Sequence, residues 1–351
     1  MAAHDFNAIA LSEHIWTVLT LPDRFFSWRI RGNALSWAVE QAELLKQPFD
    51  LIVATSMVDL ATLKGVVPAL AATPALLYFH ENQFAYPESG HARSSVEAQM
   101  TSIYSAMAAD RLLFNSAYNR DTFLSGARAL LKKLPDHAPL SLIAALQQKS
   151  AVLCVPIDAS CLSDKADRAC EPVTLVWNHR WEYDKGPERL YLVLKQLKRS
   201  GLDFRIHLLG QQFRQQPEAF NQINSEFGTL IKTWGYIENR ADYLKTLQQS
   251  DIVFSTALHD FQGISMQEAM AAGCIPVAPN RLAYPEYIPE TLLADSFEAD
   301  AGQDAAAIAA VMMRVAKQRE FYRNLVPCLT ELSWGHMAKC YSGEISALIT
   351  P

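Results

Sequence analysis

Two cations, Arg180 and Lys185, lie in a short segment between a predicted strand and a predicted helix. Pro187 favours the first turn of that helix, so both cations are expected beside its positive N-terminus. Arginine can bind two phosphate oxygens at once, and lysine adds a point charge. The segment is therefore a candidate diphosphate site. The alternative is that both side chains are solvated loop cations.

A second polar loop follows a later strand and turns directly into a helix. The first backbone N–H groups of that helix, at residues 263–265, would point at an anion. Asp260 could accept hydrogen bonds from sugar hydroxyls, and Glu268 could hold a ribose. Two alternatives stay open: Ser265-x-x-Glu268 matches a capping box, and a lone histidine such as His259 often has a structural role.

A third group of polar residues follows a hydrophobic strand, in the order His80, Glu81, Asn82. Burying these three side chains together without a function would be costly, which favours a cleft-lining role. Asn115 ends the next strand along the chain and could face the same cleft or cap the following helix.

A fourth segment, residues 24–33, interleaves three arginines with three aromatic residues. Such a surface could stack nucleobases and contact phosphates. The alternative is a loop whose aromatic rings pack on the core while its arginines are solvated.

Strand-like and helix-like runs alternate along the chain and predict parallel sheets built from βαβ units. Strands are expected at 14–21, 50–55, 75–80, 111–115, 151–156, 173–178, 204–209, 231–236, 251–256 and 275–278. Helices are expected at 34–46, 59–71, 94–109, 117–133, 187–200, 217–227, 241–250 and 264–272, with a mainly helical tail from about 303. In such sheets the ligand crevice lies beyond the carboxyl ends of the strands, where the polar segments gather.

The fold class predicted is α/β, with two Rossmann-like doubly wound domains that face an interdomain cleft. The first domain is expected at 1–160 and the second at 171–335, with a polar seam at 157–172. A C-terminal helix at 336–351 is expected to pack back on the first domain. The segment 132–150 is expected to be an irregular insertion.

Composition is that of an ordinary globular protein: 351 residues, 50% hydrophobic and 19% charged, with a formal net charge of −6. That charge gives no global footprint for nucleic acid, although a local basic patch is compatible with it. The longest apolar runs are strand-sized and no leader pattern is visible, so stable membrane insertion is not expected. The six scattered cysteines form no CxxC pair and are expected as free thiols in the cytoplasm. No metal site or cofactor is expected.

These segments resemble retaining glycosyltransferases of the GT-B architecture. Their mark is an acidic residue, seven others and then Glu, with Arg and Lys upstream; here Asp260 replaces the first Glu. A closer resemblance is to the tRNA-queuosine α-mannosyltransferase family, and it spans roughly residues 14–300. It is carried by Tyr78-Phe79-His80-Glu81-Asn82-Gln83 with Tyr86-Pro87, Phe114-Asn115-Ser116, His179-Arg180-Trp181-Glu182 with Asp184-Lys185, and Tyr284-Pro285-Glu286.

The resemblance implies transfer of mannose from GDP-mannose to queuosine in the anticodon of tRNA(Asp), with retained anomeric configuration. The catalytic residues would be His80, Arg180, Lys185 and Asp260. The donor would be bound by Arg180, Lys185, Gly210, His259, Asp260, Gly263, Ile264, Ser265 and Glu268. The acceptor would be bound by Glu81, Asn82, Tyr86, Asn115, Arg29 and Arg31.

The sequence departs from that family at its start, where the first ten residues contain no recognisable strand. A missing first strand of the sheet is therefore expected. Two alternative functions stay open. One is a GT-B transferase acting on a lipid-linked or cell-envelope acceptor, and the other is a non-catalytic protein that binds a nucleotide sugar or tRNA.

Overall fold

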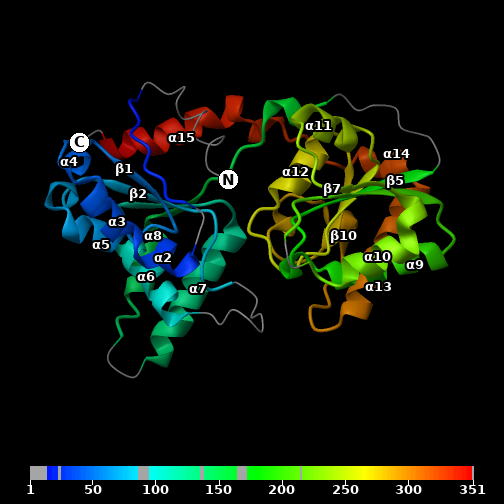
Figure 1. The fold of residues 1–351 in the computed structure, drawn as a ribbon, viewed down its shortest axis with the longest axis horizontal. Coiled ribbons are helices and arrows are strands. Elements are labelled where there is room, and N and C mark those ends of the chain that lie inside the picture. The colour runs from blue at the N-terminus through cyan, green and yellow to red at the C-terminus, as the bar shows by residue number, and fades with distance from the viewer. Residues whose placement is uncertain are drawn as a thin grey trace. The chain divides into compact units, whose positions relative to one another are not determined.

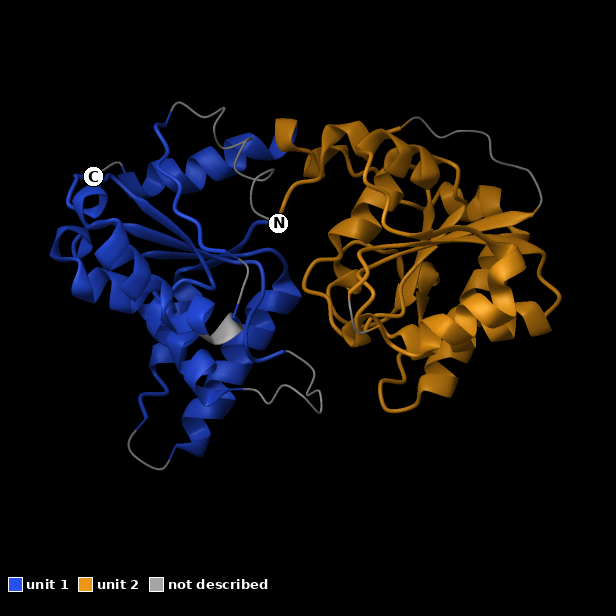
Figure 2. Ribbon diagram, viewed as in Figure 1, with its two compact units in different colours: residues 1–154, 336–351 blue, residues 155–335 orange. Residues whose placement is uncertain are grey.

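The computed structural model describes residues 14–22, 25–85, 95–134, 138–163, 172–213 and 216–349. The chain divides into two compact units (Figure 2). Unit 1 comprises residues 1–154 and 336–351, and unit 2 comprises residues 155–335. The first division therefore falls just before the polar segment 157–172.

Unit 1 contains a parallel four-stranded sheet in the order β1-β2-β3-β4. Its strands are β1 (Ile52–Thr55), β2 (Ala75–Phe79), β3 (Arg111–Phe114) and β4 (Ser150–Val152). Every residue of β2 is buried, as expected for a central parallel strand covered on both faces. The register pairs Phe79 with Phe114, so the carboxyl ends of β2 and β3 lie side by side.

Three helices of unit 1 begin at short polar side chains that cap them. Ser95, Ser116 and Asp59 each accept a hydrogen bond from a first-turn backbone N–H, at the starts of α6, α7 and α5. The helices are α2 (Phe26–Arg31), α3 (Asn33–Glu40), α4 (Ala42–Leu45), α5 (Leu60–Val66), α6 (Val96–Ala108), α7 (Ala117–Lys133) and α8 (Leu142–Gln148), with a 3₁₀ turn at Pro68–Leu70.

Two expectations for unit 1 were wrong. Residues 14–21 form no strand: Ile15 is fully exposed, while Leu19 and Leu21 pack on a helical core cluster. Leu19 and Leu21 of this apolar run therefore pack against helices instead of pairing in a sheet. The segment 132–150 contains α8 instead of being irregular. Residues 26–31 of the arginine and aromatic segment form the helix α2, where the alternative interpretation had a loop.

The last helix, α15 (Trp334–Ile349), contributes its residues from 336 onward to unit 1 (Figure 1). Arg111 at the start of β3 forms two hydrogen bonds with the Glu344 carboxylate, at 2.7 and 2.9 Å. Tyr341 donates to the Cys154 carbonyl oxygen at 2.9 Å. These contacts join the helix to β3 and to the segment that follows β4.

Unit 2 contains a parallel six-stranded sheet in the order β10-β9-β8-β5-β6-β7. Its strands are β5 (Val173–Asn178), β6 (Phe204–Leu209), β7 (Ile231–Gly235), β8 (Ile252–Phe254), β9 (Ile275–Pro279) and β10 (Leu293–Ala294). The chain builds outward from β5 to β7 and then returns to the other side of β5. The neighbours β5 and β8 therefore form the switch point, where open α/β sheets bind ligands.

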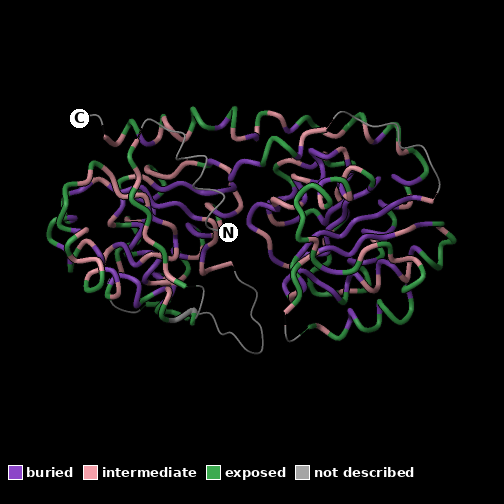
Figure 3. The backbone as a smooth tube through the Cα atoms, turned by 45° about the horizontal axis from the view of Figure 1, so that its top comes forward, coloured by how far each residue is buried: buried purple, intermediate pink, exposed green. Residues whose placement is uncertain are grey.

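The helices of unit 2 cover this sheet, and its central strands are buried along their length (Figure 3). They are α9 (Pro187–Arg199), α10 (Ala219–Phe227), α11 (Arg240–Gln248), α12 (Ile264–Ala271), α13 (Ala301–Lys317) and α14 (Arg319–Arg323). Short 3₁₀ turns lie at Ala159–Cys161, Tyr183–Lys185, Gly228–Leu230, Tyr284–Glu286, Glu290–Leu292 and Thr330–Leu332.

Candidate active site

The loops that follow β5 and β8 are joined by hydrogen bonds at the switch point of unit 2. Lys185 Nζ donates to the His259 carbonyl oxygen at 2.6 Å. In the other direction, the backbone N–H groups of Leu258 and His259 donate to the Asp184 carbonyl oxygen at 2.8 and 3.1 Å. Thr256 Oγ1 donates to the Lys185 carbonyl oxygen at 2.8 Å. The two loops therefore form one structural piece.

Gly186 permits this close approach between the loops. Its φ of 65° lies in the left-handed region, and a Cβ at this position would overlap the Thr256 carbonyl oxygen. Pro187 follows as the first residue of α9, as the sequence predicted. A glycine is required here both for its backbone conformation and for its missing side chain.

Lys185 is a buried cation between two carboxylates. Its side chain is 10% exposed, and Nζ lies 3.3 Å from Asp184 Oδ2 and 3.9 Å from Asp260 Oδ2. Arg180, by contrast, is half exposed and lies 3.0 Å from Glu182 and 3.9 Å from Asp184. Lys185 is thus a fixed charge, whereas the Arg180 guanidinium keeps a solvent-facing surface with which to meet an anion.

Asp260 lies in the β8–α12 loop, and its carboxylate already has protein partners. Oδ1 accepts the Gly263 N–H at 3.1 Å, and Oδ2 accepts the Tyr284 hydroxyl at 3.1 Å. Burial raises the pKa of Asp260, but the Lys185 charge and the Tyr284 hydrogen bond help to outweigh burial and hold the pKa below its usual value. The group is therefore a carboxylate at neutral pH, oriented by Tyr284.

Two buried histidines, His179 and His259, belong to the same cluster. Burial is the largest cause and the Lys185 charge contributes to the shift, and together they lower the pKa of each ring from 6.5 to about 4. Both rings are therefore neutral at pH 7. Among the described residues, His179 Nε2 has no hydrogen-bond partner although it is buried. His179 was not predicted to have a role from the sequence, although it precedes Arg180 directly.

The start of α12 differs from the capping box that the sequence allowed. Gly263, with a φ of 77°, is the N-cap and makes no side-chain hydrogen bond, and Ser265 lies inside the first turn. The Gly263 N–H is occupied by Asp260. The N–H groups of Ile264 and Ser265 belong to the first turn, which lacks intrahelical acceptors, so they are the helix donors suited to an anion.

Glu268 is held by two residues that were not predicted from the sequence, Arg240 and Tyr243. Arg240 Nη2 donates to Glu268 Oε1 at 2.7 Å, and the Tyr243 hydroxyl donates to Oε2 at 2.8 Å. Asn178 at the end of β5 donates to that same hydroxyl at 2.7 Å. The Glu268 side chain is 15% exposed, so its carboxylate is oriented and still reachable. No sequence pattern predicted these contacts, because they depend on how α11 packs beside α12.

Gly210 lies at the carboxyl end of β6, against the backbone of His179. Its φ is 141°, and a Cβ there would overlap the His179 carbonyl oxygen. Its N–H donates to the Gly235 carbonyl oxygen at 3.1 Å. The structure thus brings together, within unit 2, the predicted donor residues Arg180, Lys185, Gly210, His259, Asp260, Gly263, Ile264, Ser265 and Glu268.

In unit 1, His80 follows β2 and is held through its backbone. Asn115 Nδ2 donates to the His80 carbonyl oxygen at 2.9 Å, and Asn119 Nδ2 in α7 donates to Asn115 Oδ1 at 2.8 Å. Burial lowers the pKa of His80 to about 4, and its Nδ1 has no hydrogen-bond partner among the described residues. Ser116, not Asn115, caps α7.

The other predicted acceptor residues differ in what their side chains contact. Asn82 is buried and bonds to Asn119, Thr122 and the backbone N–H groups of residues 84 and 85. Arg31 pairs with Asp59 at 2.5 Å. Arg29 lies on α2 beside it, Glu81 follows His80, and Tyr86 lies outside the described residues.

Within the described ranges, no group of three or more His, Cys, Asp or Glu side chains is placed to hold a metal ion. The described helices include none with the length and apolar character needed to span a membrane.

Comparison with solved structures shows the fold. Sucrose-phosphate synthase from Thermosynechococcus elongatus superposes with a TM-score of 0.67 at 16% identity, covering 94% of this chain and 81% of that one. A glycosyltransferase from Rickettsia africae gives 0.62 at 16% identity, covering 95% and 85%. The pneumococcal O-GlcNAc transferase GtfA gives 0.64 at 13% identity, and this chain spans 60% of its length.

Comparison of sequences shows the family. Residues 163–327 match the family described as glycosyl transferases group 1, which with the two parallel sheets defines a GT-B glycosyltransferase. Residues 5–157 match the family described as tRNA-queuosine alpha-mannosyltransferase N-terminal. The tRNA-queuosine alpha-mannosyltransferase of Drosophila melanogaster is 36% identical over 284 residues, covering 78% of this chain and 74% of that protein. The chain belongs to the tRNA-queuosine alpha-mannosyltransferase family.

Proposed function

We propose that the protein transfers mannose from GDP-mannose to queuosine in the anticodon of tRNA(Asp), with retention of anomeric configuration. The observation that carries the proposal is the buried Lys185 ammonium, fixed by the His259 carbonyl between the two loops at the switch point. The family membership supports a sugar donor and a tRNA acceptor for this site.

The donor diphosphate is assigned to the cations and the helix start of unit 2. Lys185 and Arg180 offset the negative charge that develops on the departing diphosphate, and the N–H groups of Ile264 and Ser265 add fixed dipoles. Such preorganised charge is the largest catalytic term in many enzymes. Glu268 is assigned to the ribose hydroxyls, because its carboxylate is partly exposed and lies about one turn into the same helix, α12.

The sugar is assigned to His259 and Asp260, which lie between the diphosphate residues. Asp260 is ionised and accepts hydrogen bonds from hydroxyl groups, and the neutral His259 ring offers both a donor and an acceptor. His80 of unit 1 is assigned to the reacting sugar as a third neutral imidazole. Glu81 is assigned to the acceptor hydroxyls, and Arg29 to the tRNA backbone.

Retention is assigned to attack on the same face from which the diphosphate leaves. The acceptor oxygen forms the new bond to the anomeric carbon as the bond to the phosphate oxygen breaks. The acceptor proton passes to that departing oxygen, so no protein nucleophile is required. The surroundings of Asp260 support this route, because both of its oxygens are engaged by Gly263 and Tyr284.

The test is mass spectrometry of tRNA nucleosides after incubation with GDP-mannose, using tRNA that contains or lacks queuosine. We expect a hexose added to queuosine in the first sample only. Addition of hexose to both samples, or to neither, would overturn the assigned acceptor. Parallel reactions with UDP-glucose test the donor. A lipid-linked or cell-envelope acceptor and a non-catalytic binding role are disfavoured by the family membership.

A further inference from the structure

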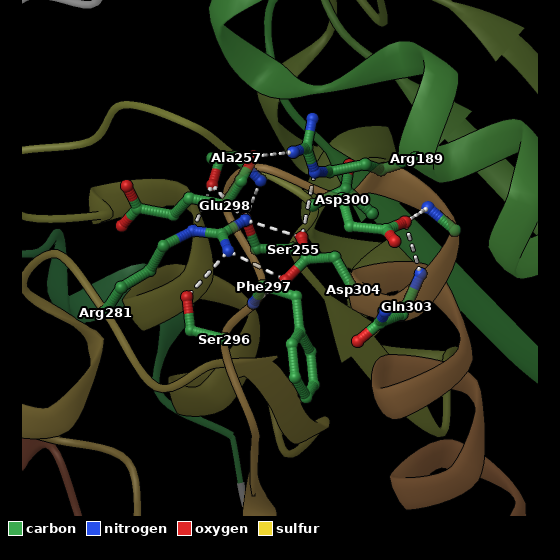
Figure 4. Close-up of polar contacts among 12 residues, drawn as sticks. Arg189, Ser255, Ala257, Arg281, Ser296, Phe297, Glu298, Asp300, Gln303 and Asp304 are labelled. Atoms are coloured by element: carbon green, nitrogen blue, oxygen red, sulfur yellow. Dashed lines mark hydrogen bonds and ion pairs between the residues drawn. The ribbon is translucent and has the colours of Figure 1, made fainter.

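A buried carboxylate outside the donor site, Asp304, connects both loops of that site to one helix. Asp304 lies in the first turn of α13, and its side chain is completely buried. Arg281 donates to it twice, at 2.8 and 2.9 Å, and Arg189 Nε donates at 2.9 Å. Figure 4 shows the two guanidinium groups converging on this one carboxylate.

Each arginine connects Asp304 to a different loop of the donor site. Arg281 donates from Nε and Nη2 to the Ala257 carbonyl oxygen, at 3.1 and 3.0 Å, which fixes the loop that carries His259 and Asp260. Arg189 lies in the first turn of α9, directly after the Lys185–Gly186 turn. The planar guanidinium of Arg281 is the only kind of side chain that can bind the carboxylate and the carbonyl in this fork geometry.

We propose that Asp304, acting through Arg281, is a positioning residue for the nucleotide-sugar site. Asp304 fixes the position of the 257–260 backbone relative to Lys185, although it contacts neither the donor nor the reacting atoms. The carbonyl that Arg281 holds is two residues before His259, whose own carbonyl binds Lys185. A shift of that segment moves the acceptor of Lys185 and the Asp260 carboxylate together.

The test uses the full chain with Arg281→Lys, which keeps the positive charge but cannot bind Asp304 and the Ala257 carbonyl together. Asp300→Ala is the matched control, because Asp300 caps the same helix through the N–H groups of residues 302 and 303 without contacting the loop. The probes are GDP binding by calorimetry and amide hydrogen exchange of residues 257–260.

We expect Arg281→Lys to weaken GDP binding about tenfold, as a small misplacement of binding groups does. Exchange at the Leu258 and His259 amides should rise together with it. Asp300→Ala should lower the melting temperature and leave both readouts unchanged. Wild-type GDP affinity and loop exchange in Arg281→Lys would overturn the inference. Equal rises in exchange across α13 and the loop in both variants would also overturn it, by showing a general role in folding.

The inference rests on the proposed function, but different experimental results would contradict the inference and the proposed function. If wild-type protein binds UDP and not GDP, the donor assignment fails, and UDP then serves as the probe. If no queuosine is modified, the acceptor assignment fails, and the exchange experiment still tests the loop. Asp304→Asn is a second variant, and a folded Asp304→Asn protein with wild-type loop exchange would contradict the role given to the carboxylate.

Discussion

Lys185 and His259 are joined by a 2.6 Å hydrogen bond from the Lys185 ammonium to the His259 backbone carbonyl oxygen. The two residues are 74 positions apart in the sequence and follow two strands that are direct neighbours in the sheet. The bond fixes a buried positive charge at the edge where open α/β sheets bind ligands. It makes Lys185 the residue on which the donor-site assignment chiefly depends.

Replacing Lys185 by alanine should lower turnover at least tenfold, because the charge that offsets the leaving diphosphate is lost. The protein should remain folded, since the Asp184 backbone still accepts from Leu258 and His259. Steady-state kinetics and a thermal melt measure the two effects. Arg199→Ala, at the exposed end of α9, is the control and should retain wild-type turnover. Full turnover in Lys185→Ala would remove the phosphate-binding assignment.

Replacing Tyr243 by phenylalanine should weaken GDP binding about fivefold, equivalent to about 1 kcal/mol for a lost hydrogen bond. The change leaves Glu268 Oε2 without its donor and frees the carboxylate to rotate. Tyr191→Phe is the matched control, because that hydroxyl donates to the exposed Glu226 carboxylate at 2.9 Å. Equal GDP affinity in wild type and Tyr243→Phe would show that Glu268 needs no such support.

Gly186→Ala should destabilise the protein more than Gly201→Ala. Both glycines have positive φ, 65° and 75°, so both substitutions carry a backbone strain of roughly 1–2 kcal/mol. Only at Gly186 does the new Cβ meet the Thr256 carbonyl oxygen, whereas Gly201 faces open space. We expect an additional loss of about 2 kcal/mol from this overlap, measured by urea unfolding. Equal losses of stability in the two variants would mean that the loop at Gly186 can move away from Thr256 without cost.

Stability should fall as the pH is lowered from about 6.5 to about 4. In the unfolded chain His179 titrates near 6.5, while burial lowers its pKa in the folded protein to about 4. Between these values the unfolded state binds more protons, so protonation favours unfolding. The contribution is on the order of 3 kcal/mol for one ring, and it is complete above the unfolded pKa. His259, with the same shift, adds to the effect.

Urea unfolding of wild type and His179→Gln at several pH values tests this expectation. The variant should lose less stability than wild type between pH 6.5 and 4, because one titrating ring has been removed. An unchanged pH dependence in the variant would show that His179 is not held neutral by the folded structure.

Much of the fold and donor site was predictable from local patterns. Alternating strand and helix periods located β1 to β9, because buried parallel strands are continuous apolar runs. The two-residue strand β10 was not predicted. The α/β fold with two parallel-sheet units and the family were predicted and are confirmed. The strand predicted at residues 14–21 was wrong, because a short run rich in apolar residues fits packing against helices as well as it fits a strand.

The sequence by itself determined which residues carry charge at the strand ends, because residue type and strand–loop–helix order are local properties. It could not determine the partners of those residues. Three points depend on packing between distant segments. They are which residue begins α12, Ser265 or Gly263, which side chains Asn82 contacts, and which groups hold Glu268. The tertiary structure decided these points, because hydrogen bonds such as those of Asp304 join residues that only the folded chain brings within 3 Å.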